Sequence, residues 1–281
     1  MSIREAEIYL KSELQRIYDL QESRAIARWL MHSLCGRDYF MRYDEELGTD
    51  AAARIKAAMP RLMAGEPVQY IAGESEFYGL TLEITRAALI PRPETEELVD
   101  TVRKAIDISH PLIFDIGTGS GAIALALKSV MPDARIFGSD ISREALSLAR
   151  RNASNLGLEV TFIEHDILNE PWPDIPKADV VVSNPPYISW SERASLPAAV
   201  REYEPSLALF VKDDDPLLFY RVIAKKAKDR LRPGGQIFFE IHEAYGPEMI
   251  KVLKETGYHE TELQHDLQGK ARIIKATPVP Q

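Results

Sequence analysis

The sequence contains very little cysteine and no long apolar run. Cys35 is the only cysteine among the 281 residues, which excludes an internal disulfide and favours a reducing compartment. No stretch approaches the roughly 20 apolar residues that a membrane-spanning helix requires, and the residues after Met1 lack the apolar segment of a secretory signal. We therefore expect a cytoplasmic protein without membrane-spanning segments.

Positive charge is also scarce. The chain has 34 Lys and Arg residues against 43 Asp and Glu residues, a formal net charge of −9, which disfavours direct nucleic-acid binding across the surface. No group of Cys and His residues has the spacing of metal ligands, so no metal site is expected. Apolar residues make up 45% and charged residues 27% of the chain, an ordinary globular composition. The length fits one large domain with a smaller one.

The first part of the chain has a helical pattern. Apolar residues recur at helical spacing over residues 3–20. Ser23 is expected to cap a second helix, and Thr49 to begin a third that Pro60 kinks or divides. We predict a small helical domain over residues 1–72.

The pattern changes after this domain. Alternating apolar residues over 77–85 predict a short hairpin within a linker at residues 73–96, where Thr95 can cap the next helix. Strand and helix candidates then alternate through a third region, residues 97–281, as in a parallel sheet covered by helices. The predicted parallel strands end at Asp115, Asp140, Asp166, Asn184 and His242.

Two further strand candidates, residues 260–265 and 271–276, lie at the end of the chain and are separated by a turn. Five parallel strands followed by a hairpin are typical of one seven-stranded variant of the Rossmann-like α/β fold. A nicotinamide-binding domain would instead continue with another crossover.

A glycine-rich loop follows the first predicted strand and opens a helix. Its glycines permit a tight turn and a close approach of the backbone to a ligand. The spacing is Gly-x-Gly-x-Gly, without the final glycine of the dinucleotide fingerprint, which favours a nucleoside that carries no pyrophosphate. The loop consists of Gly117, Thr118, Gly119, Ser120 and Gly121.

Acidic residues end the neighbouring strands. Asp140 is placed to accept hydrogen bonds from both hydroxyls of a ribose, and Asp166 with Ile167 to meet an adenine edge and ring. Asp115 adds negative charge near the same place. Such strand ends suit a cationic sulfonium cofactor, S-adenosylmethionine, better than a dianionic pyrophosphate.

The fourth predicted strand delivers Asn184-Pro185-Pro186-Tyr187 to the edge of the sheet where ligands bind in open α/β folds. The side-chain oxygen of Asn184 and the carbonyl of Pro185 can accept the two N–H groups of a planar amide or amine, which aims its nitrogen at a methyl donor. Pro186 helps to fix a rigid turn, and Tyr187 offers a planar face. These residues favour nitrogen methylation.

The residues alone leave other interpretations open. The glycine loop by itself would permit an oxidoreductase that uses a nicotinamide cofactor, and the tetrapeptide could be an ordinary turn. A cofactor-binding partner without catalytic activity is a third class. For the methyl acceptor, the tetrapeptide does not choose between a glutamine amide and adenine N6 of DNA.

Together with several further motifs, these residues resemble the peptide chain release factor glutamine N5-methyltransferases over nearly the whole chain. The further motifs are Gly65-Glu66-Pro67-Val68-Gln69-Tyr70-Ile71, Glu76-Phe77-Tyr78-Gly79, Leu89-Ile90-Pro91-Arg92-Pro93-Glu94-Thr95-Glu96, Tyr203-Glu204-Pro205, Arg232-Pro233-Gly234-Gly235 and Glu240-Ile241. Two segments depart from the family pattern, namely residues 210–216 and the turn around His242.

The resemblance implies a function and a site. It implies S-adenosylmethionine bound by the glycine loop, Asp140, Asp166, Ile167 and Asn184, with the tetrapeptide holding a glutamine of a release factor Gly-Gly-Gln loop. It further implies that the N-terminal helices dock the release factor, and that Phe77 and Arg92 border the site. A ribosomal-protein glutamine or adenine N6 remains an alternative acceptor.

Overall fold

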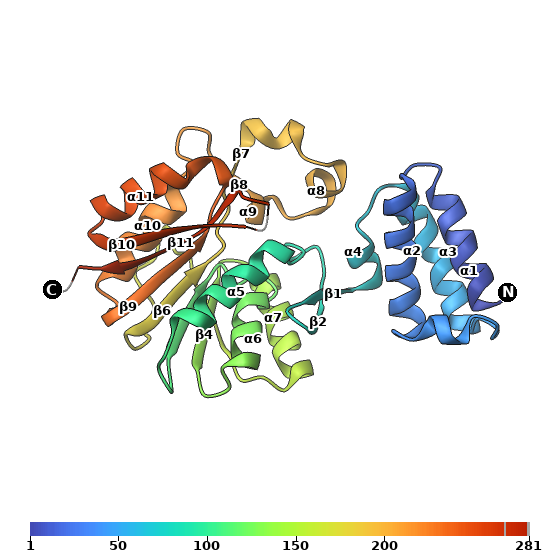
Figure 1. Ribbon diagram of the computed structural model, residues 1–281, viewed down its shortest axis with the longest axis horizontal. Helices are drawn as coiled ribbons and strands as arrows, with labels where there is room; N and C mark the ends of the chain where they lie inside the picture. Colours follow the sequence, from blue (N-terminus) through green and yellow to red (C-terminus); the bar gives the residue numbers. More distant parts are fainter. Residues whose placement is uncertain (267, 280–281) are drawn as a thin grey trace. The chain divides into compact units, whose positions relative to one another are not determined.

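The computed structural model describes residues 1–266 and 268–279, which form two compact units. Unit 1 comprises Met1–Glu74 together with Pro197–Tyr203, and unit 2 comprises the remaining described residues. The first segment of unit 1 is blue to cyan in Figure 1, and unit 2 continues from cyan to red. Within the described residues, no helix combines the length and the apolar character needed to cross a membrane.

Unit 1 consists of helices packed around a single apolar core. Its amphipathic helices bury Leu10, Leu14, Leu30, Ile55 and Leu62, none of which is more than 2% exposed. The hydroxyl of Tyr203 donates to the carbonyl of Ala64 at 2.9 Å, which ties the second segment to the first. The helices are α1 (Ile3–Leu14), α2 (Leu20–Cys35), η1 (Tyr39–Arg42), α3 (Thr49–Met63), α4 (Val68–Ala72) and α8 (Ala198–Tyr203).

One predicted helix cap of unit 1 is wrong, and one of the two alternatives predicted for Pro60 is excluded. The predicted cap Ser23 is wrong, because Asp19 caps α2 by accepting the backbone N–H groups of Gln21 and Glu22, each at 2.8 Å. Pro60 lies inside α3 and starts no new helix. The helix ends three residues later at Met63, so the N–H group that proline lacks falls close to the end of the hydrogen-bond ladder.

Unit 2 contains a seven-stranded sheet with the order β10-β11-β9-β6-β3-β4-β5, which confirms the predicted fold class. The five adjacent strands from β9 to the edge strand β5 are parallel, and β11 is antiparallel between β9 and β10. The terminal hairpin therefore inserts its second strand next to the parallel set. The strands are β3 (Leu112–Ile116), β4 (Arg135–Asp140), β5 (Thr161–Glu164), β6 (Ala178–Ser183), β9 (Leu231–Glu240), β10 (Tyr258–His265) and β11 (Ala271–Pro278).

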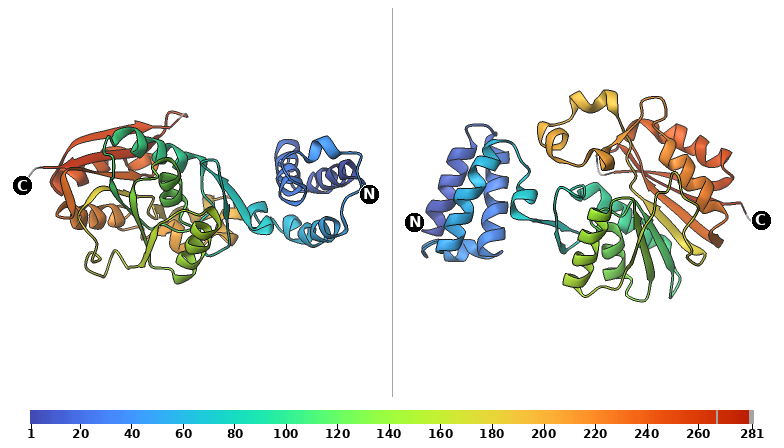
Figure 2. Two further views of the ribbon diagram at one scale, coloured as in Figure 1. Left: turned by 90° about the horizontal axis from the view of Figure 1, so that it is seen from below. Right: turned by 180° about the vertical axis from the view of Figure 1, so that it is seen from behind.

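Helices cover both faces of this sheet, because the central strands are apolar on both sides (Figures 1 and 2). Ile113 and Val180 contact the core under α5 and α6, whereas Phe114 and Val181 contact the core under α10 and α11. The principal helices are α5 (Pro93–Ala105), α6 (Ala122–Val130), α7 (Arg143–Leu156), α10 (Leu218–Lys228) and α11 (Gly246–Glu255).

Short elements complete unit 2. The predicted hairpin is present, and Tyr78 and Gly79 form its two-residue turn with φ values of 50° and 76°. A second small sheet pairs the residues after the tetrapeptide with a strand that follows α9. These elements are β1 (Glu74–Phe77), β2 (Leu80–Glu83), β7 (Ile188–Ser189), η2 (Trp190–Ser195), α9 (Ser206–Leu209), β8 (Phe210–Val211) and η3 (Glu243–Tyr245).

Several predicted boundaries in unit 2 differ from the structure, three of them by two or three residues. Helix α5 begins at Pro93, since proline fits the first helical position, so Thr95 is not its cap. Strand β5 ends at Glu164 because the side chain of Asp166 accepts backbone N–H groups of its own turn. Strand β9 ends at Glu240, two residues before the predicted end at His242.

Candidate functional site

The register of the central strands places the predicted site residues at one edge of the sheet. Ile116 pairs with Ser139 on β4 and with Ser183 on β6. The next residues in the chain, including Asp140 and Asn184, therefore meet at the carboxyl edge, where open α/β folds bind ligands.

A cavity of about 430 Å³ lies at this edge, within unit 2. Its lining also includes residues of the β2–α5 connection and of α9. The predicted site residues in its lining are Arg92, Gly117, Thr118, Gly119, Ser120, Asp140, Asp166, Ile167, Asn184, Pro185 and Pro186. The volume lies within the range of small-molecule sites.

The glycine loop owes its shape to backbone conformations that favour glycine. Gly117, Gly119 and Gly121 have φ values of 74°, 56° and 83°. The backbone N–H of Gly117 donates to the carbonyl of Ser139 at 2.8 Å, which seats the loop on β4. Gly121 faces the protein instead of the cavity, since a Cβ there would lie 3.1–3.2 Å from Leu125 and other side chains. Gly121 therefore permits close packing rather than ligand contact.

Gly138 contributes to the same packing and was missed in the sequence analysis. A Cβ at Gly138 would lie 2.9 Å from the ring of Phe162 and 2.9 Å from Oγ1 of Thr118. The glycine on β4 thus makes room for the Thr118 side chain of the glycine loop. An isolated glycine in an apolar strand is the signal that could have identified it.

Asp140 organises the loop through both carboxylate oxygens. Oδ2 accepts the backbone N–H of Gly119 at 2.9 Å, and Oδ1 accepts that of Ser142 at 2.9 Å. Burial raises the pKa of Asp140, while these backbone donors lower it. Each oxygen keeps a second lone pair for a ligand hydroxyl.

Asp166 lines the cavity, but its side chain is engaged in its own turn. Oδ1 accepts the backbone N–H groups of Leu168 and Asn169 at 2.9 and 3.3 Å, and Oδ2 accepts Nδ2 of Asn169 at 2.8 Å. The side-chain hydrogen bond from Asn169 lowers the pKa of Asp166. The structure brings Asp166 and the buried Ile167 to the predicted place.

Asp115 lies beneath the loop and is fully buried. Oδ2 accepts the hydroxyl of Thr118 at 2.6 Å, whereas no described residue bonds to Oδ1. Burial raises the pKa of Asp115 to about 7, against the effect of the Thr118 hydrogen bond.

This pKa makes the stability of unit 2 depend on pH. The unfolded carboxyl titrates at 3.8 and the folded one at about 7, so the folded protein loses stability as pH rises between these values. Asp115→Asn removes this titration. The free energy of unfolding of the variant minus that of the wild type should be about 4 kcal/mol more positive at pH 8 than at pH 4. This value follows from about 1.4 kcal/mol for each pKa unit.

Urea unfolding of both proteins at the two pH values measures this difference. Asp133→Asn removes an exposed carboxylate and provides the control. A stability difference between Asp115→Asn and wild type that is equal at pH 4 and pH 8 would contradict the assignment.

The tetrapeptide begins where β6 ends, beside the last residue of β9. Ser183 pairs with Phe239, which places Asn184 next to Glu240. The amide Nδ2 of Asn184 donates to Oγ1 of Thr95 at 3.2 Å, and that hydroxyl donates to Oε2 of Glu240 at 2.7 Å. The hydroxyl of Tyr187 donates to Oε1 of the same carboxylate at 3.2 Å.

Glu240 belongs to one of the motifs that carry the resemblance, but no role was predicted for it. It is 1% exposed at the end of an apolar strand. Burial raises its pKa, while the Thr95 hydrogen bond, the charge of Arg272 and the Tyr187 hydrogen bond lower it. A lone acidic residue at the end of such a strand was the available signal.

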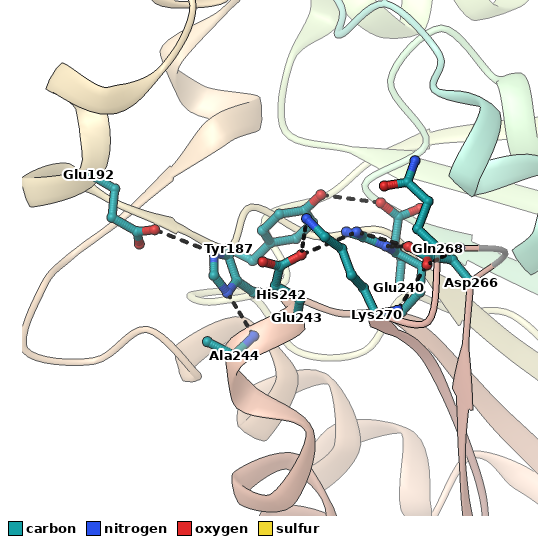
Figure 3. Close-up of polar contacts among 10 residues, drawn as sticks. Tyr187, Glu192, Glu240, His242, Glu243, Ala244, Asp266, Gln268 and Lys270 are labelled. Carbon is teal, nitrogen blue, oxygen red and sulfur yellow. Dashed lines mark hydrogen bonds and ion pairs between the residues drawn. The ribbon is translucent and has the colours of Figure 1, made fainter.

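Besides Gly121, two residues predicted for the site lie outside the cavity lining. Phe77 is 1% exposed and packs in the apolar core with Leu82 and Leu98, so the structure does not bring it to the cavity. Tyr187 lies outside the cavity lining, and its ring meets that of His242 edge to face at 5.9 Å (Figure 3). Burial raises the pKa of Tyr187. Arg92 lines the cavity and pairs with the buried Glu204.

The two segments that depart from the pattern of the resemblance, residues 210–216 and the turn around His242, both contact the residues that follow the tetrapeptide. His242 Nδ1 accepts the backbone N–H of Ala244 at 3.1 Å, and Nε2 lies 3.3 Å from Glu192 (Figure 3). In the 210–216 segment, Asp213 accepts the backbone N–H of Ser191 at 2.8 Å. Phe210 stacks on Trp190 with ring centroids 4.4 Å apart.

Comparison with known proteins identifies both parts of the chain. Residues 5–73 match the model of the PrmC N-terminal domain, and residues 109–276 match that of a methyltransferase domain. Among solved structures, a methyltransferase from Pyrococcus furiosus superposes with a TM-score of 0.52 at 17% identity. The match covers 83% of this chain and 100% of the other, and it supports the fold.

Curated relatives agree over almost the full length. The release factor glutamine methyltransferase of Bacteroides thetaiotaomicron is 40% identical, over 95% of this chain and 97% of that protein. The protein of the same name from Flavobacterium psychrophilum is 39% identical, over 87% of each chain. The chain therefore belongs to the family of release factor glutamine methyltransferases.

Proposed function

We propose that this protein transfers the methyl group of S-adenosylmethionine to the side-chain amide nitrogen, N5, of the glutamine in the Gly-Gly-Gln motif of peptide chain release factors. The observation that carries the proposal is Asn184, which lines the cavity while Thr95 holds its Nδ2. The named relatives support the release factor as the substrate. Cys35 and the net charge of −9 are consistent with a cytoplasmic protein substrate.

The cavity fits the cofactor. The glycine loop lets the backbone form part of the cavity wall, Asp140 keeps lone pairs for the ribose hydroxyls, and Ile167 supplies an apolar surface for adenine. The buried Oδ1 of Asp115 lacks a partner among the described residues, and the carboxyl adds negative charge beneath the loop only in its ionised form. S-adenosylmethionine would supply an activated methyl group, so the protein need not activate the donor.

The acceptor requires more from the protein, because the nitrogen lone pair of an amide is delocalised into its carbonyl. Asn184 Oδ1 and the carbonyl of Pro185 accept the two N–H groups of the glutamine in this proposal. Those two hydrogen bonds fix the amide plane, and such orientation can supply a large part of the rate enhancement. The methylated nitrogen is acidic enough to lose a proton without a strong base.

The remaining site residues support this arrangement. Pro185 and Pro186 restrict the backbone dihedrals of the turn that carries the acceptors. Arg92 is held by Glu204 at the cavity wall and is proposed to border the substrate. A stacking role of Tyr187 on the glutamine remains a prediction, whereas its contact with Glu240 suggests that it steadies the turn.

Mass spectrometry of a release factor incubated with enzyme and cofactor tests the proposal. We expect one methyl group on the glutamine of the Gly-Gly-Gln peptide, and none when that glutamine is replaced by glutamate. Ribosomal proteins and DNA serve as competing acceptors in parallel reactions. An unmodified Gly-Gly-Gln peptide alongside methylation of either competitor would refute the assignment of the substrate.

A further inference from the structure

A buried chain of hydrogen bonds connects both ends of the tetrapeptide to one carboxylate. Glu240 accepts the hydroxyls of Thr95 and Tyr187 on its two oxygens, at 2.7 and 3.2 Å (Figure 3 shows the Tyr187 bond). The Thr95 hydroxyl in turn accepts Nδ2 of Asn184 at 3.2 Å. Thr95 and Glu240 are 5% and 1% exposed, so water does not compete freely for these bonds.

The chemistry of the groups gives this chain a direction. An ionised carboxylate only accepts hydrogen bonds, so the single hydrogen of the Thr95 hydroxyl points at Glu240. Lone pairs of that hydroxyl are left for Asn184, and only the amide NH2 of Asn184 can donate to them. Oδ1 of Asn184, and not its NH2, is then left for another partner.

We propose that Glu240 is a positioning residue that fixes the orientation of the Asn184 side chain, so that an acceptor oxygen faces the substrate amide. This proposal rests on the proposed function for the identity of the substrate. The relay, by which we mean the hydrogen bonds that join Asn184, Thr95 and Glu240, does not depend on it. If the Asn184 amide were reversed, its NH2 would meet the N–H groups of the glutamine, and a donor would face a donor. The substrate amide would then keep only one of the two hydrogen-bond acceptors that the protein is proposed to supply.

Burial raises the pKa of Glu240, and the positive charge of Arg272 opposes this effect and favours the ionised form. Arg272 stabilises the carboxylate electrostatically and is itself bonded to Asp266 through Nε and a terminal nitrogen, each at 3.2 Å. Arg272 lies on β11, which pairs with β9. The inserted strand of the hairpin therefore brings the compensating charge to the end of the strand that carries Glu240.

Glu240→Gln keeps the shape of the side chain but removes the direction of the relay, because its NH2 can donate to Thr95. The Thr95 hydroxyl can then turn toward Asn184, and both amide orientations become accessible. We expect kcat to fall about 10- to 30-fold, below the about 100-fold effect of removing a positioned catalytic hydrogen bond outright. KM for the release factor and Kd for the cofactor should change less than about threefold, since orientation acts mainly on the reacting complex.

Thr95 variants and a matched carboxylate separate this role from a structural one. Thr95→Val interrupts the relay and should lower kcat as much as Glu240→Gln, whereas Thr95→Ser should restore it. Asp179 is also buried, accepts Leu112 N–H and Arg232 at 2.7 Å, and lies at the opposite end of β6. Asp179→Asn should reduce stability without lowering kcat. Equal kcat losses in Glu240→Gln and Asp179→Asn, or failure of Thr95→Ser to restore kcat, would overturn the proposal.

A second measurement does not depend on the methyl acceptor. Asn184→Asp replaces the NH2 that donates to Thr95 with a carboxylate oxygen that can only accept. The Thr95 hydroxyl has one hydrogen, so it cannot donate to Glu240 and to this new carboxylate at the same time. We expect this variant to be destabilised in urea, and Glu240→Gln to recover part of the loss because its NH2 frees the hydroxyl hydrogen. Additive losses in the double variant would refute the relay even if release factor methylation is confirmed. If the stability losses of the two substitutions are not additive, but the release factor gains no methyl group, the relay stands and only the proposed function is refuted.

Discussion

Replacing Asn184 with alanine should lower kcat for methyl transfer by about 10²- to 10³-fold, the range seen when one positioned hydrogen-bonding group is removed from an active site. The side chain is proposed to contribute an acceptor that acts on the substrate nitrogen, and the two prolines that follow it have no side-chain acceptor. Its Nδ2 is already bonded to Thr95. The loss should therefore appear in kcat, with cofactor Kd changing less than about fivefold, because transition-state positioning is removed rather than uniform binding.

Single-turnover transfer from labelled cofactor to release factor measures this loss, and calorimetry measures cofactor binding. Asn169→Ala is the matched control, because Asn169 also lines the cavity but bonds to Asp166 instead of the tetrapeptide relay. Its kcat should stay within about threefold of the wild-type value, as for residues outside the reacting centre. Retention of more than a tenth of wild-type kcat in Asn184→Ala would remove Asn184 from the mechanism.

The fold could be predicted because its signals are local. Strands such as β3 and β6 are short apolar runs with a polar residue at or beside the end, and a following helix such as α7 has its own apolar face. The glycine loop, Asp140 and Asn184 were found for the same reason, since they come directly after such runs. Parallel strands in register then bring their ends together without further information.

Several errors concern residues whose role depends on distant partners, whereas local hydrogen bonds set the start of α2 and the end of β5. Thr95 is of a residue type that often caps helices, but its hydroxyl donates a hydrogen bond to Glu240, which is 145 residues away in the chain. Phe77 belongs to a motif near the site, yet the direction of its side chain follows from packing between the hairpin and α5. The grouping of Pro197–Tyr203 with unit 1 also depends on tertiary contacts alone.

The same limit explains why site residues differ in what the sequence reveals about them. Gly121 fits the loop pattern, but its missing Cβ makes room for Leu125 and neighbouring side chains, not for a ligand. Glycine is required at this position for two different reasons, a positive φ and close packing. Only the three-dimensional surroundings separate these reasons from contact with a cofactor.

Asp140→Asn should weaken S-adenosylmethionine binding by about 30- to 100-fold. A hydrogen bond to a charged group contributes about 1.5–3 kcal/mol, and each 1.4 kcal/mol corresponds to about a tenfold change in Kd. The substitution also places an NH2 group against the backbone N–H of either Gly119 or Ser142, both of which now donate to the carboxylate. The substitution therefore removes a hydrogen-bond acceptor from the backbone of the loop and also one from the ribose hydroxyls.

Isothermal titration with S-adenosylmethionine provides the measurement, and a parallel titration of the wild type with NAD separates the two cofactor classes. Glu144→Gln removes another carboxylate from the lining of the same cavity and is exposed, so it controls for the loss of negative charge. Its cofactor Kd should change less than about threefold, as expected for a screened surface charge. Equal weakening by Asp140→Asn and Glu144→Gln would mean that Asp140 attracts the cationic cofactor only through its charge. A larger effect of Asp140→Asn, with kcat preserved at saturating cofactor, would place its carboxylate in direct contact with the bound nucleoside.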